Sequence, residues 1–317
     1  MDQFKEILKE YPEIYVVCDR NVEQYIPQLG LQDCPRMAID ATEENKTIGT
    51  AVELCRWLLS SGADRDALLL AVGGGVTTDI AGFAASIYKR GIKYANVPTT
   101  LVGQVDAGLG GKTGVNLDGY KNILGCFREP EFVYVLPETL ESLPEREFRS
   151  GAAELLKTFI IDNEYDCYET AVKILREPLN IEELTPLISR ASEIKQEIVE
   201  KDPYDQGERR VLNLGHTWAH AIEWYEQTHP VKSPLLHGEA VSIGIVQAAR
   251  KSVKLGLAKP ELVEKLRKDL HACGLPVELP YSESELEQAI AKDKKAQGGR
   301  INYVLPVEIG KVVIRRI

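Results

Sequence analysis

Short apolar runs recur along the first half of the chain, and segments with helical periodicity separate them. A run of this length without polar alternation is typical of a strand buried on both faces of a parallel sheet. Helices are expected over residues 47–61 and 78–88. The expected strands cover residues 14–18, 67–72, 94–98 and 132–136. Strands that alternate with helices predict an α/β fold, with a Rossmann-like, doubly wound domain over residues 1–148.

The pattern changes after roughly residue 148, where helical periodicity dominates. The final stretch, residues 301–317, has Gly310 between two apolar runs and predicts either a small hairpin or loose strands. A second, mostly α-helical domain is therefore expected over residues 149–317. Its expected helices cover residues 150–161, 164–176, 181–201, 209–227, 237–256, 260–272 and 283–292.

One expected helix carries an unusual polar face. If residues 209–223 are helical, four polar side chains step by four, three and four and share one face. A guanidinium, a carboxamide and two imidazoles are not ordinary core, and neutral imidazoles on adjacent turns can share one cation. The face predicts the wall of a site that holds a metal and an anionic ligand. Its residues are Arg209, Asn213, His216 and His220.

Clustering of histidines supports this interpretation. The chain has 5 histidines, and His237 follows the two helical ones in a His-Gly-Glu-Ala segment. A lone histidine is more often a structural residue than a ligand. His229 and His271 do not belong to such a cluster of polar residues, so we interpret both as structural.

A run of three glycines, Gly73-Gly74-Gly75, stands between an expected strand and an expected helix. Glycines here let the backbone approach a ligand closely and aim amides at a phosphate. The spacing is not the usual GxGxxG, and a purely structural turn is the alternative. Open α/β sheets bind ligands at the carboxyl ends of their strands, so we favour a nucleotide site. Asp19, Glu43 and Lys46 are candidates for ribose contacts.

A second polar constellation follows the next expected strand. Gly110-Gly111-Lys112 resembles part of a phosphate loop, but the Walker spacing is absent, which argues against a nucleoside triphosphatase. A glycine-rich surface loop would explain the glycines but not so many hydrogen-bonding side chains. Those side chains are Thr99, Thr100, Asp106, Lys112, Thr113, Asn116, Lys121 and Asn122.

Composition limits the classes of binding partner that are expected for this chain. A net charge of -10 argues against nucleic acid, whose phosphates are held by clustered cations, but leaves room for a small anionic substrate in a cationic cleft. No apolar run reaches membrane-spanning length, and the first residues lack the profile of a signal peptide. The 6 cysteines are scattered without a CxxC pair, as expected of reduced thiols. A cytoplasmic protein without membrane contact is expected.

Ordered motifs from about Asp19 to the C-terminus resemble the 3-dehydroquinate synthase family, a branch of the sugar phosphate cyclases. The resemblance is specific because so many motifs occur in the same order. In the first half they are Gly73-Gly74-Gly75-Val76 with Asp79, Tyr88-Lys89-Arg90-Gly91, Val97-Pro98-Thr99-Thr100-Leu101, Gly103-Gln104-Val105-Asp106, Gly110-Gly111-Lys112-Thr113-Gly114 and Lys121-Asn122. In the second half they are Leu143-Pro144-Glu145-Arg146-Glu147, Ala153-Glu154-Leu155-Leu156-Lys157, Asn213 with His216 and His220, His237-Gly238-Glu239-Ala240, Asp293-Lys294-Lys295 and Leu305-Pro306.

The resemblance implies a shikimate-pathway lyase that converts 3-deoxy-D-arabino-heptulosonate 7-phosphate to 3-dehydroquinate and phosphate. Such enzymes use catalytic NAD and one divalent metal, commonly zinc or cobalt, and a homodimer is expected from the resemblance alone. Lysines and arginines suit the substrate's carboxylate and phosphate. His220 suits proton transfer. NAD ends each cycle unchanged.

The resemblance also implies residue roles. The metal-ligand positions match Glu154, His216 and His237. The catalytic positions match Lys112, Lys157, Lys195 and His220. Further substrate-binding positions match Arg90, Asp106, Asn122, Arg209, Asn213 and the pair Lys294 and Lys295. The NAD-binding positions match Asp19, Glu43, Lys46, Gly74, Gly75, Val76, Asp79, Thr99, Thr100, Lys112, Lys121 and Ser142.

One departure keeps alternatives open. Thr78 stands where most members have glycine, and cyclases that make valiolone precursors from sedoheptulose 7-phosphate also carry Thr-Asp at this point. Those cyclases typically lose the second helix histidine and the asparagine, whereas His220 and Asn213 are present here. A metal-dependent polyol dehydrogenase shares the expected architecture but usually lacks the lysine cluster. A non-catalytic binding protein would be expected to lose some ligands, and none is missing.

Overall fold

The computed structural model describes residues 2–229, 231–282, 284–286, 289–290 and 300–317. The chain forms two compact units, an N-terminal unit, Met1–Leu143, and a C-terminal unit, Pro144–Ile317. The division expected after residue 148 would fall within the first helix of the C-terminal unit, which begins at Glu145. Within the described ranges, no helix is long and apolar enough to cross a membrane.

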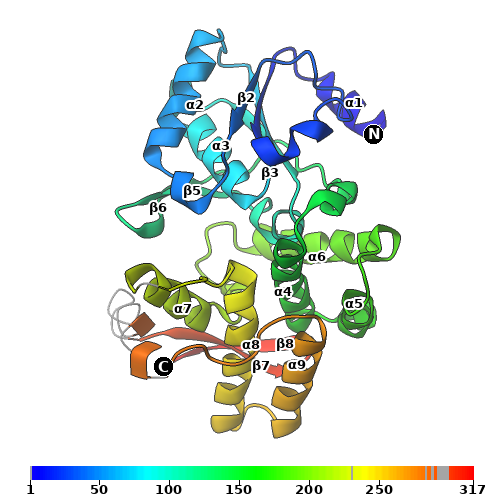
Figure 1. Cartoon of the computed structure of the whole chain (residues 1–317), viewed down its shortest axis with the longest axis vertical. Helices are drawn as coiled ribbons and strands as arrows, with labels where there is room; N and C mark the ends of the chain where they lie inside the picture. The colour runs from blue at the N-terminus through cyan, green and yellow to red at the C-terminus, as the bar shows by residue number, and fades with distance from the viewer. Residues whose placement is uncertain (1, 230, 283, 287–288, 291–299) are drawn as a thin grey trace. The chain divides into compact units, whose positions relative to one another are not determined.

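A four-stranded parallel sheet forms the centre of the N-terminal unit (Figure 1). The strands lie in the order β2-β1-β3-β4. Val16 of β1 lies opposite Arg36 of β2 on one side and Leu70 of β3 on the other, and Leu70 lies opposite Ala95 of β4. The strands are β1 (Ile14–Asp19), β2 (Arg36–Ile39), β3 (Leu68–Gly73) and β4 (Lys93–Pro98).

Both faces of this sheet are covered, which explains the unbroken apolar runs. Tyr15 and Val17 of β1 pack in one cluster with the buried faces of α2 (Ile48–Ser60) and α3 (Gly75–Ile87). Val16 and Cys18 pack on the opposite face in a second cluster, with Phe4 of α1 (Asp2–Leu8). Side chains that alternate along a strand must both be apolar when both faces are buried. The predicted α/β, doubly wound fold class is confirmed.

Three elements of the N-terminal unit differ from expectation. β2 was not predicted, and its exposed, basic start at Arg36 weakens the apolar signal. The predicted strand at residues 132–136 is reduced to a single parallel bridge between Asn96 and Val133. From Lys112 to Asn122, the polar constellation lies on an antiparallel hairpin of β5 (Lys112–Leu117) and β6 (Tyr120–Phe127), where no strands were predicted.

The C-terminal unit is mostly helical, as predicted. Helix α8 is its central helix and packs against α4, α7, α9 and strand β7 (Figure 1). Strands β7 (Asn302–Glu308) and β8 (Lys311–Arg316) form an antiparallel hairpin, which was one of the two alternatives for this stretch. The helices are α4 (Glu145–Ile161), α5 (Cys167–Leu175), α6 (Ile181–Lys201), α7 (His216–Thr228), α8 (His237–Lys254) and α9 (Pro260–Ala272).

The helix expected to run from residue 209 is broken, because residues Glu208–Asn213 form a 3-10 turn and α7 begins only at His216. Gly215 has φ 82° at the break, which a continuing right-handed helix cannot have. Much of the helix expected over residues 283–292, and both Lys294 and Lys295, lie outside the described residues.

Candidate functional site

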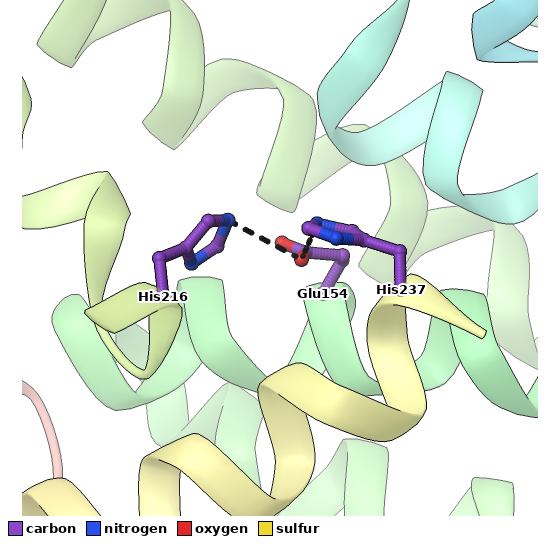
Figure 2. Close-up of side chains that lie close together, drawn as sticks. All are labelled: Glu154, His216 and His237. Atoms are coloured by element: carbon purple, nitrogen blue, oxygen red, sulfur yellow. Dashed lines mark ion pairs between the residues drawn. The ribbon is translucent and has the colours of Figure 1, made fainter. Parts of the chain in front are cut away.

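Three potential metal ligands converge in the C-terminal unit. Glu154 comes from α4, His216 from the first position of α7 and His237 from the first position of α8 (Figure 2). Their candidate ligand atoms all lie within 4.8 Å of one another. Glu154 Oε1 is 3.9 Å from His216 Nε2 and 3.3 Å from His237 Nε2. Figure 2 shows both imidazoles turned toward the carboxylate between them.

Close helix packing brings the two histidines to Glu154. A Cβ on Gly238 would lie 1.8 Å from the Ser150 carbonyl oxygen, so only glycine lets α8 begin this close to α4. A Cβ on Gly244 would lie 2.0 Å from the Gly215 carbonyl oxygen, so glycine at this position lets the start of α7 pack closely against α8. Small residues at these contacts therefore place His216 and His237 beside α4.

The rest of the His-Gly-Glu motif also has a structural explanation. The Glu239 carboxylate accepts a hydrogen bond from the Leu236 amide at 2.8 Å and so caps α8. It also accepts two bonds from the Arg146 guanidinium, at 2.8 and 2.7 Å. Arg146 donates further to the Pro234 carbonyl. The Arg146–Glu239 pair therefore joins the first turn of α4 to the first turn of α8, next to His237.

Both histidines present the same ring nitrogen to the cluster. The Nδ1 of His216 lies 3.1 Å from the Leu214 carbonyl oxygen, and the Nδ1 of His237 lies 3.1 Å from Glu223 Oε1. Carbonyl and carboxylate oxygens can only accept, so Nδ1 carries the hydrogen in each ring. The lone pair of the neutral ring is then on Nε2, which faces Glu154.

The cluster is strongly coupled electrostatically. Burial raises the pKa of Glu154, but the Lys157 ammonium, at 2.5 Å, and the two histidines outweigh burial and hold that pKa well below its usual range. Burial lowers the pKa of His216 to about 3, and Lys157 adds to the effect. Burial also lowers the pKa of His237, but hydrogen bonds to Glu154 and Glu223 outweigh it and raise the pKa to about 10.

This donor set fits a divalent metal. Two imidazole nitrogens and one carboxylate oxygen are the ligand types of catalytic zinc and cobalt sites, which keep positions open for substrate. Two carboxylates, Glu154 and Glu223, flank His237, and a cation bound at Nε2 would take the place of the proton that they stabilise. Glu154 is completely buried, so a cation beside it would offset the cost of burying its charge.

Several other predicted residues lie in the same unit. Lys157, Lys195 and Arg209 are all buried, at 1%, 6% and 2% exposure, which is rare for cations. Arg209 donates to the Pro203 carbonyl at 2.7 Å. Asn213 is half-buried at the end of the 3-10 turn. Only two of the four polar positions expected on one helix face therefore share α7.

His220 keeps its predicted relation to His216. The two rings are one turn apart on α7, with centroids 5.4 Å apart and planes perpendicular. His220 is exposed, whereas His216 is largely buried. The exposed imidazole is accessible to solvent and is of the side-chain type that can donate or accept a proton.

In the N-terminal unit, the three glycines join β3 to α3 as expected. Gly73 ends β3, Gly74 is the N-cap of α3 and Gly75 is its first residue. A Cβ on Gly74 would lie 2.8 Å from Thr100 Cγ2, and one on Gly75 would lie 2.9 Å from Ala107 Cβ. Glycine is needed here for close approach, and the amides at the start of α3 form the kind of helix terminus that binds phosphate.

A buried lysine ties three of the predicted NAD and substrate positions together. Lys46 Nζ lies 2.5 Å from Asp79 Oδ2 on α3 and donates to Asn122 Oδ1 on β6 at 2.6 Å. Asn116 extends the network, because its side chain accepts from the Asn122 amide and donates to Glu43 Oε1 at 2.8 Å. The hairpin is thereby fixed beside the glycine turn.

The remaining predicted residues of this unit occupy varied positions. Asp19 caps a 3-10 turn at the end of β1, and burial raises the pKa of its carboxyl. The Thr99 amide donates to the Gly73 carbonyl, and Thr100 Oγ1 accepts from the Gly103 amide. Ser142 Oγ accepts from the Tyr25 hydroxyl at 3.0 Å. Val76 and Asp106 are half-buried, while Arg90, Lys112 and Lys121 are exposed.

Thr78 causes no backbone strain at the position where most family members have glycine. It lies inside α3, is buried, and its hydroxyl donates to the Gly75 carbonyl at 3.1 Å. The residue therefore replaces glycine in a regular helical turn, where any L-residue is allowed.

Sequence reasoning missed Glu223 as a contributor to the ligand cluster and gave Arg146 no individual role. Glu223 lies seven residues after His216 and three after His220, so helical periodicity could have found it on the same face of α7. Arg146 and Glu239 lie in two motifs that the resemblance had already marked, but nothing in sequence pairs them.

The chain is similar in sequence to known proteins. Residues 36–150 match the family model of the 3-dehydroquinate synthase N-terminal region, and residues 151–296 match that of its C-terminal region. The 3-dehydroquinate synthase of Thermodesulfovibrio yellowstonii is 46% identical over 277 residues, covering 86% of this chain and 76% of the relative. That of Dictyoglomus thermophilum is 37% identical over 324 residues, covering 99% and 89%.

A solved structure is similar as well. ValA, a 2-epi-5-epi-valiolone synthase from Streptomyces hygroscopicus subsp. jinggangensis 5008 with NAD+ and Zn2+ bound, has a TM-score of 0.87 to this chain at 28% identity. The match covers 98% of this chain and 89% of that one. The family expected from the motifs is confirmed, and the chain belongs to the 3-dehydroquinate synthase family.

Proposed function

We propose that this protein converts 3-deoxy-D-arabino-heptulosonate 7-phosphate to 3-dehydroquinate and phosphate, with catalytic NAD and one divalent metal. The observation that carries the proposal is the cluster of Glu154, His216 and His237, which lies in the same unit as the buried cations Lys157, Lys195 and Arg209. A metal-ligand set alone would suit many enzymes. Buried cations in addition suit a substrate that carries negative charge.

Each cofactor has residues that would hold it. Glu154, His216 and His237 would hold the metal, which when bound acidifies a substrate hydroxyl and stabilises negative charge on its oxygen. The amides of the glycine turn and the polar residues around Lys46 would hold NAD, which when bound accepts a hydride and later returns it. NAD and zinc are named with ValA, a relative of similar fold.

The protein's own side chains would do the remaining work. Lys157, Lys195 and Arg209 would bind and orient the anionic groups of the substrate in the C-terminal unit. In the N-terminal unit, Lys112, Arg90, Asp106 and Asn122 are proposed for substrate contacts. Asn213 and His220 would contact the substrate beside the metal ligands, and His220 would move a proton. Lys294 and Lys295, which lie outside the described residues, remain proposed as substrate contacts on the resemblance alone.

We also propose that the protein acts as a homodimer in the cytoplasm, without nucleic acid or membrane partners. The net charge of -10 supports the absence of nucleic acid. Sedimentation velocity of the purified protein tests the dimer, and a single species of monomer mass over the micromolar range would contradict it.

The direct test of the reaction is phosphate release. The metal-loaded protein, supplied with NAD and the heptulosonate phosphate, is expected to release one phosphate per molecule of 3-dehydroquinate formed. Both products are measured in the same reaction mixture. No phosphate release from a folded, metal-loaded protein would exclude the proposed function.

Dependence on NAD is the first prediction. Protein stripped of nucleotide by unfolding and refolding should lose nearly all phosphate release, and added NAD should restore it. Absorbance at the NADH maximum should stay flat over many turnovers, because the hydride returns to the substrate within each cycle. NADH that accumulates in step with product would identify a net dehydrogenase, the alternative that shares this architecture.

Substrate choice is the second prediction. We expect kcat/KM for the heptulosonate phosphate to exceed that for sedoheptulose 7-phosphate, which has no carboxylate. Loss of one charge-assisted contact costs roughly 1.5–3 kcal/mol, or about tenfold to a hundredfold. Both substrates are assayed with the same metal and NAD. This comparison also tests the second candidate function, a valiolone-type cyclase, which the similarity to ValA and the pair Thr78-Asp79 favour. A higher kcat/KM for the sedoheptulose phosphate would establish that alternative.

A further inference from the structure

Glu223 is a buried carboxylate next to the proposed metal ligands, and neither the motifs nor the resemblance gives it a role. Its side chain is only 9% exposed, and Oε1 lies 3.1 Å from His237 Nδ1. A carboxylate this buried is costly to the fold unless hydrogen bonds and charges compensate it. The contacts of Glu223 should therefore explain why a carboxylate is buried at this point.

We infer that Glu223 is a positioning residue for His237: it accepts the Nδ1 hydrogen and so aims Nε2 at the metal. The inference rests on the metal centre of the proposed function. His237 is held between two carboxylates, with Nδ1 on Glu223 at 3.1 Å and Nε2 on Glu154 at 3.3 Å. A carboxylate on the far nitrogen of a metal-binding imidazole fixes its tautomer and orientation and makes it a stronger ligand.

The second histidine of the cluster provides a comparison. His216 is fixed in the same way, with Nδ1 on the Leu214 carbonyl at 3.1 Å and Nε2 turned toward Glu154. The backbone beside its own helix supplies that acceptor. His237 is the first residue of α8, its side chain is 36% exposed, and its Nδ1 acceptor comes from another helix, α7. Without Glu223 the more exposed ring would have the freer orientation.

Capping of α8 does not account for Glu223. A carboxylate near the start of a helix often serves the free amides there. At α8, Glu239 accepts from the Leu236 amide at 2.8 Å, and Ser150 Oγ accepts from the Gly238 amide at 3.0 Å. Glu223 accepts its bond from the side chain of the proposed ligand itself.

The neighbouring Glu226 shows what a purely structural carboxylate does on the same helix. It lies one turn after Glu223 and accepts from the Leu235 amide at 2.8 Å and from the Tyr281 hydroxyl at 2.9 Å. Those bonds hold the chain at Leu235, before α8, and at Tyr281 against α7. Glu223, in contrast, accepts a hydrogen bond from the side chain of His237, a proposed metal ligand.

The test compares metal affinity with stability, using Co²⁺ alone as the probe. Glu223→Gln keeps the shape and an oxygen acceptor but removes the charge, and Glu223→Ala removes the group. The control is Asp269→Asn, which neutralises another buried carboxylate of the C-terminal unit, bonded to Lys265 at 2.9 Å. Metal-free proteins are titrated with Co²⁺ against a competing chelator, with the visible absorption of bound Co²⁺ as signal, and thermal unfolding is recorded without metal.

We expect Glu223→Gln to weaken Co²⁺ binding about tenfold to a hundredfold, with the metal-free unfolding midpoint unchanged. Glu223→Ala should weaken binding at least as much, and Asp269→Asn should leave it unchanged. Wild-type affinity in Glu223→Gln would overturn the inference and leave the proposed function standing. If Co²⁺ binding weakens and the metal-free protein becomes less stable to the same extent, Glu223 serves the fold. That result would also overturn the inference. Failure of the wild-type protein to bind Co²⁺ would remove the proposed metal centre itself, and the inference with it.

Discussion

Replacing His237 with alanine should strip the protein of bound metal and of turnover while leaving it folded. His237 supplies one of three candidate ligands, and its Nε2 lies 3.3 Å from Glu154 Oε1 in the cluster. A catalytic site has only three protein ligands, because it keeps a further position open for substrate. Loss of one of the three leaves two, which bind the metal far more weakly. Since a catalytic metal contributes several kcal/mol to transition-state stabilisation, kcat should fall roughly a thousandfold or more.

Elemental analysis of the purified variant gives its metal content, and phosphate release gives kcat. His229→Ala is the matched control, because His229 is exposed, stacks on Tyr225 with ring centroids 4.1 Å apart, and lies outside the cluster. It should keep both metal and activity. Full metal occupancy in His237→Ala would show that the ligand assignment is wrong, whatever the activity.

The parallel sheet could be predicted because burial on both faces leaves a direct trace in sequence. Tyr15, Val16, Val17 and Cys18 are all buried, so β1 is an unbroken apolar run. The hairpin of β5 and β6 leaves no such trace. β6 is largely exposed, and β5 contains Gly114, which allows close backbone contact: a Cβ there would lie 2.7 Å from the Leu124 carbonyl oxygen. Glycines and polar residues together indicate a loop unless the facing strand is known.

The metal cluster was only partly predictable from spacing. His216 and His220 share α7 as expected, and that relation depends on periodicity alone. The expected continuation back to Arg209 was wrong because periodicity ignores the glycine at the break, where φ is 82°. Glycine inside a helical pattern is itself a signal of a helix end.

Glu154 was found through the family resemblance, because its surroundings in sequence look like those of any buried helix with one charged pair. Its neighbours Ala153 and Leu155 are fully buried, and Lys157 follows at the spacing of an ordinary i,i+3 ion pair. Which helices approach one another is decided by tertiary packing at Gly238 and Gly244. A single sequence does not reveal that contact, so neither the Glu154–His237 meeting nor the Glu223–His237 bond could be derived from it.

Replacing Gly238 with alanine should damage both the stability of the C-terminal unit and its metal site. The added Cβ would lie 1.8 Å from the Ser150 carbonyl oxygen and 2.8 Å from Ser150 Oγ, so the start of α8 must move away from α4. Ser150 lies one turn before Glu154, and His237 is the residue before Gly238, so this movement separates two proposed ligands. Overpacking against backbone that cannot rotate away should cost about 3 kcal/mol or more. The thermal unfolding midpoint should fall by roughly 5–10 °C.

The control is Gly49→Ala in α2, where the nearest atom to an added Cβ is Thr47 Oγ1 at 3.4 Å. Alanine is the better helix former, so that variant should be as stable as the wild-type protein or slightly more so. Thermal unfolding without metal and Co²⁺ titration are measured on both variants. If Gly238→Ala unfolds at the wild-type temperature and binds Co²⁺ with wild-type affinity, α8 does not depend on this contact. The convergence of the ligands would then require another cause than close packing at Gly238, because the helix would have found room for a methyl group without moving His237.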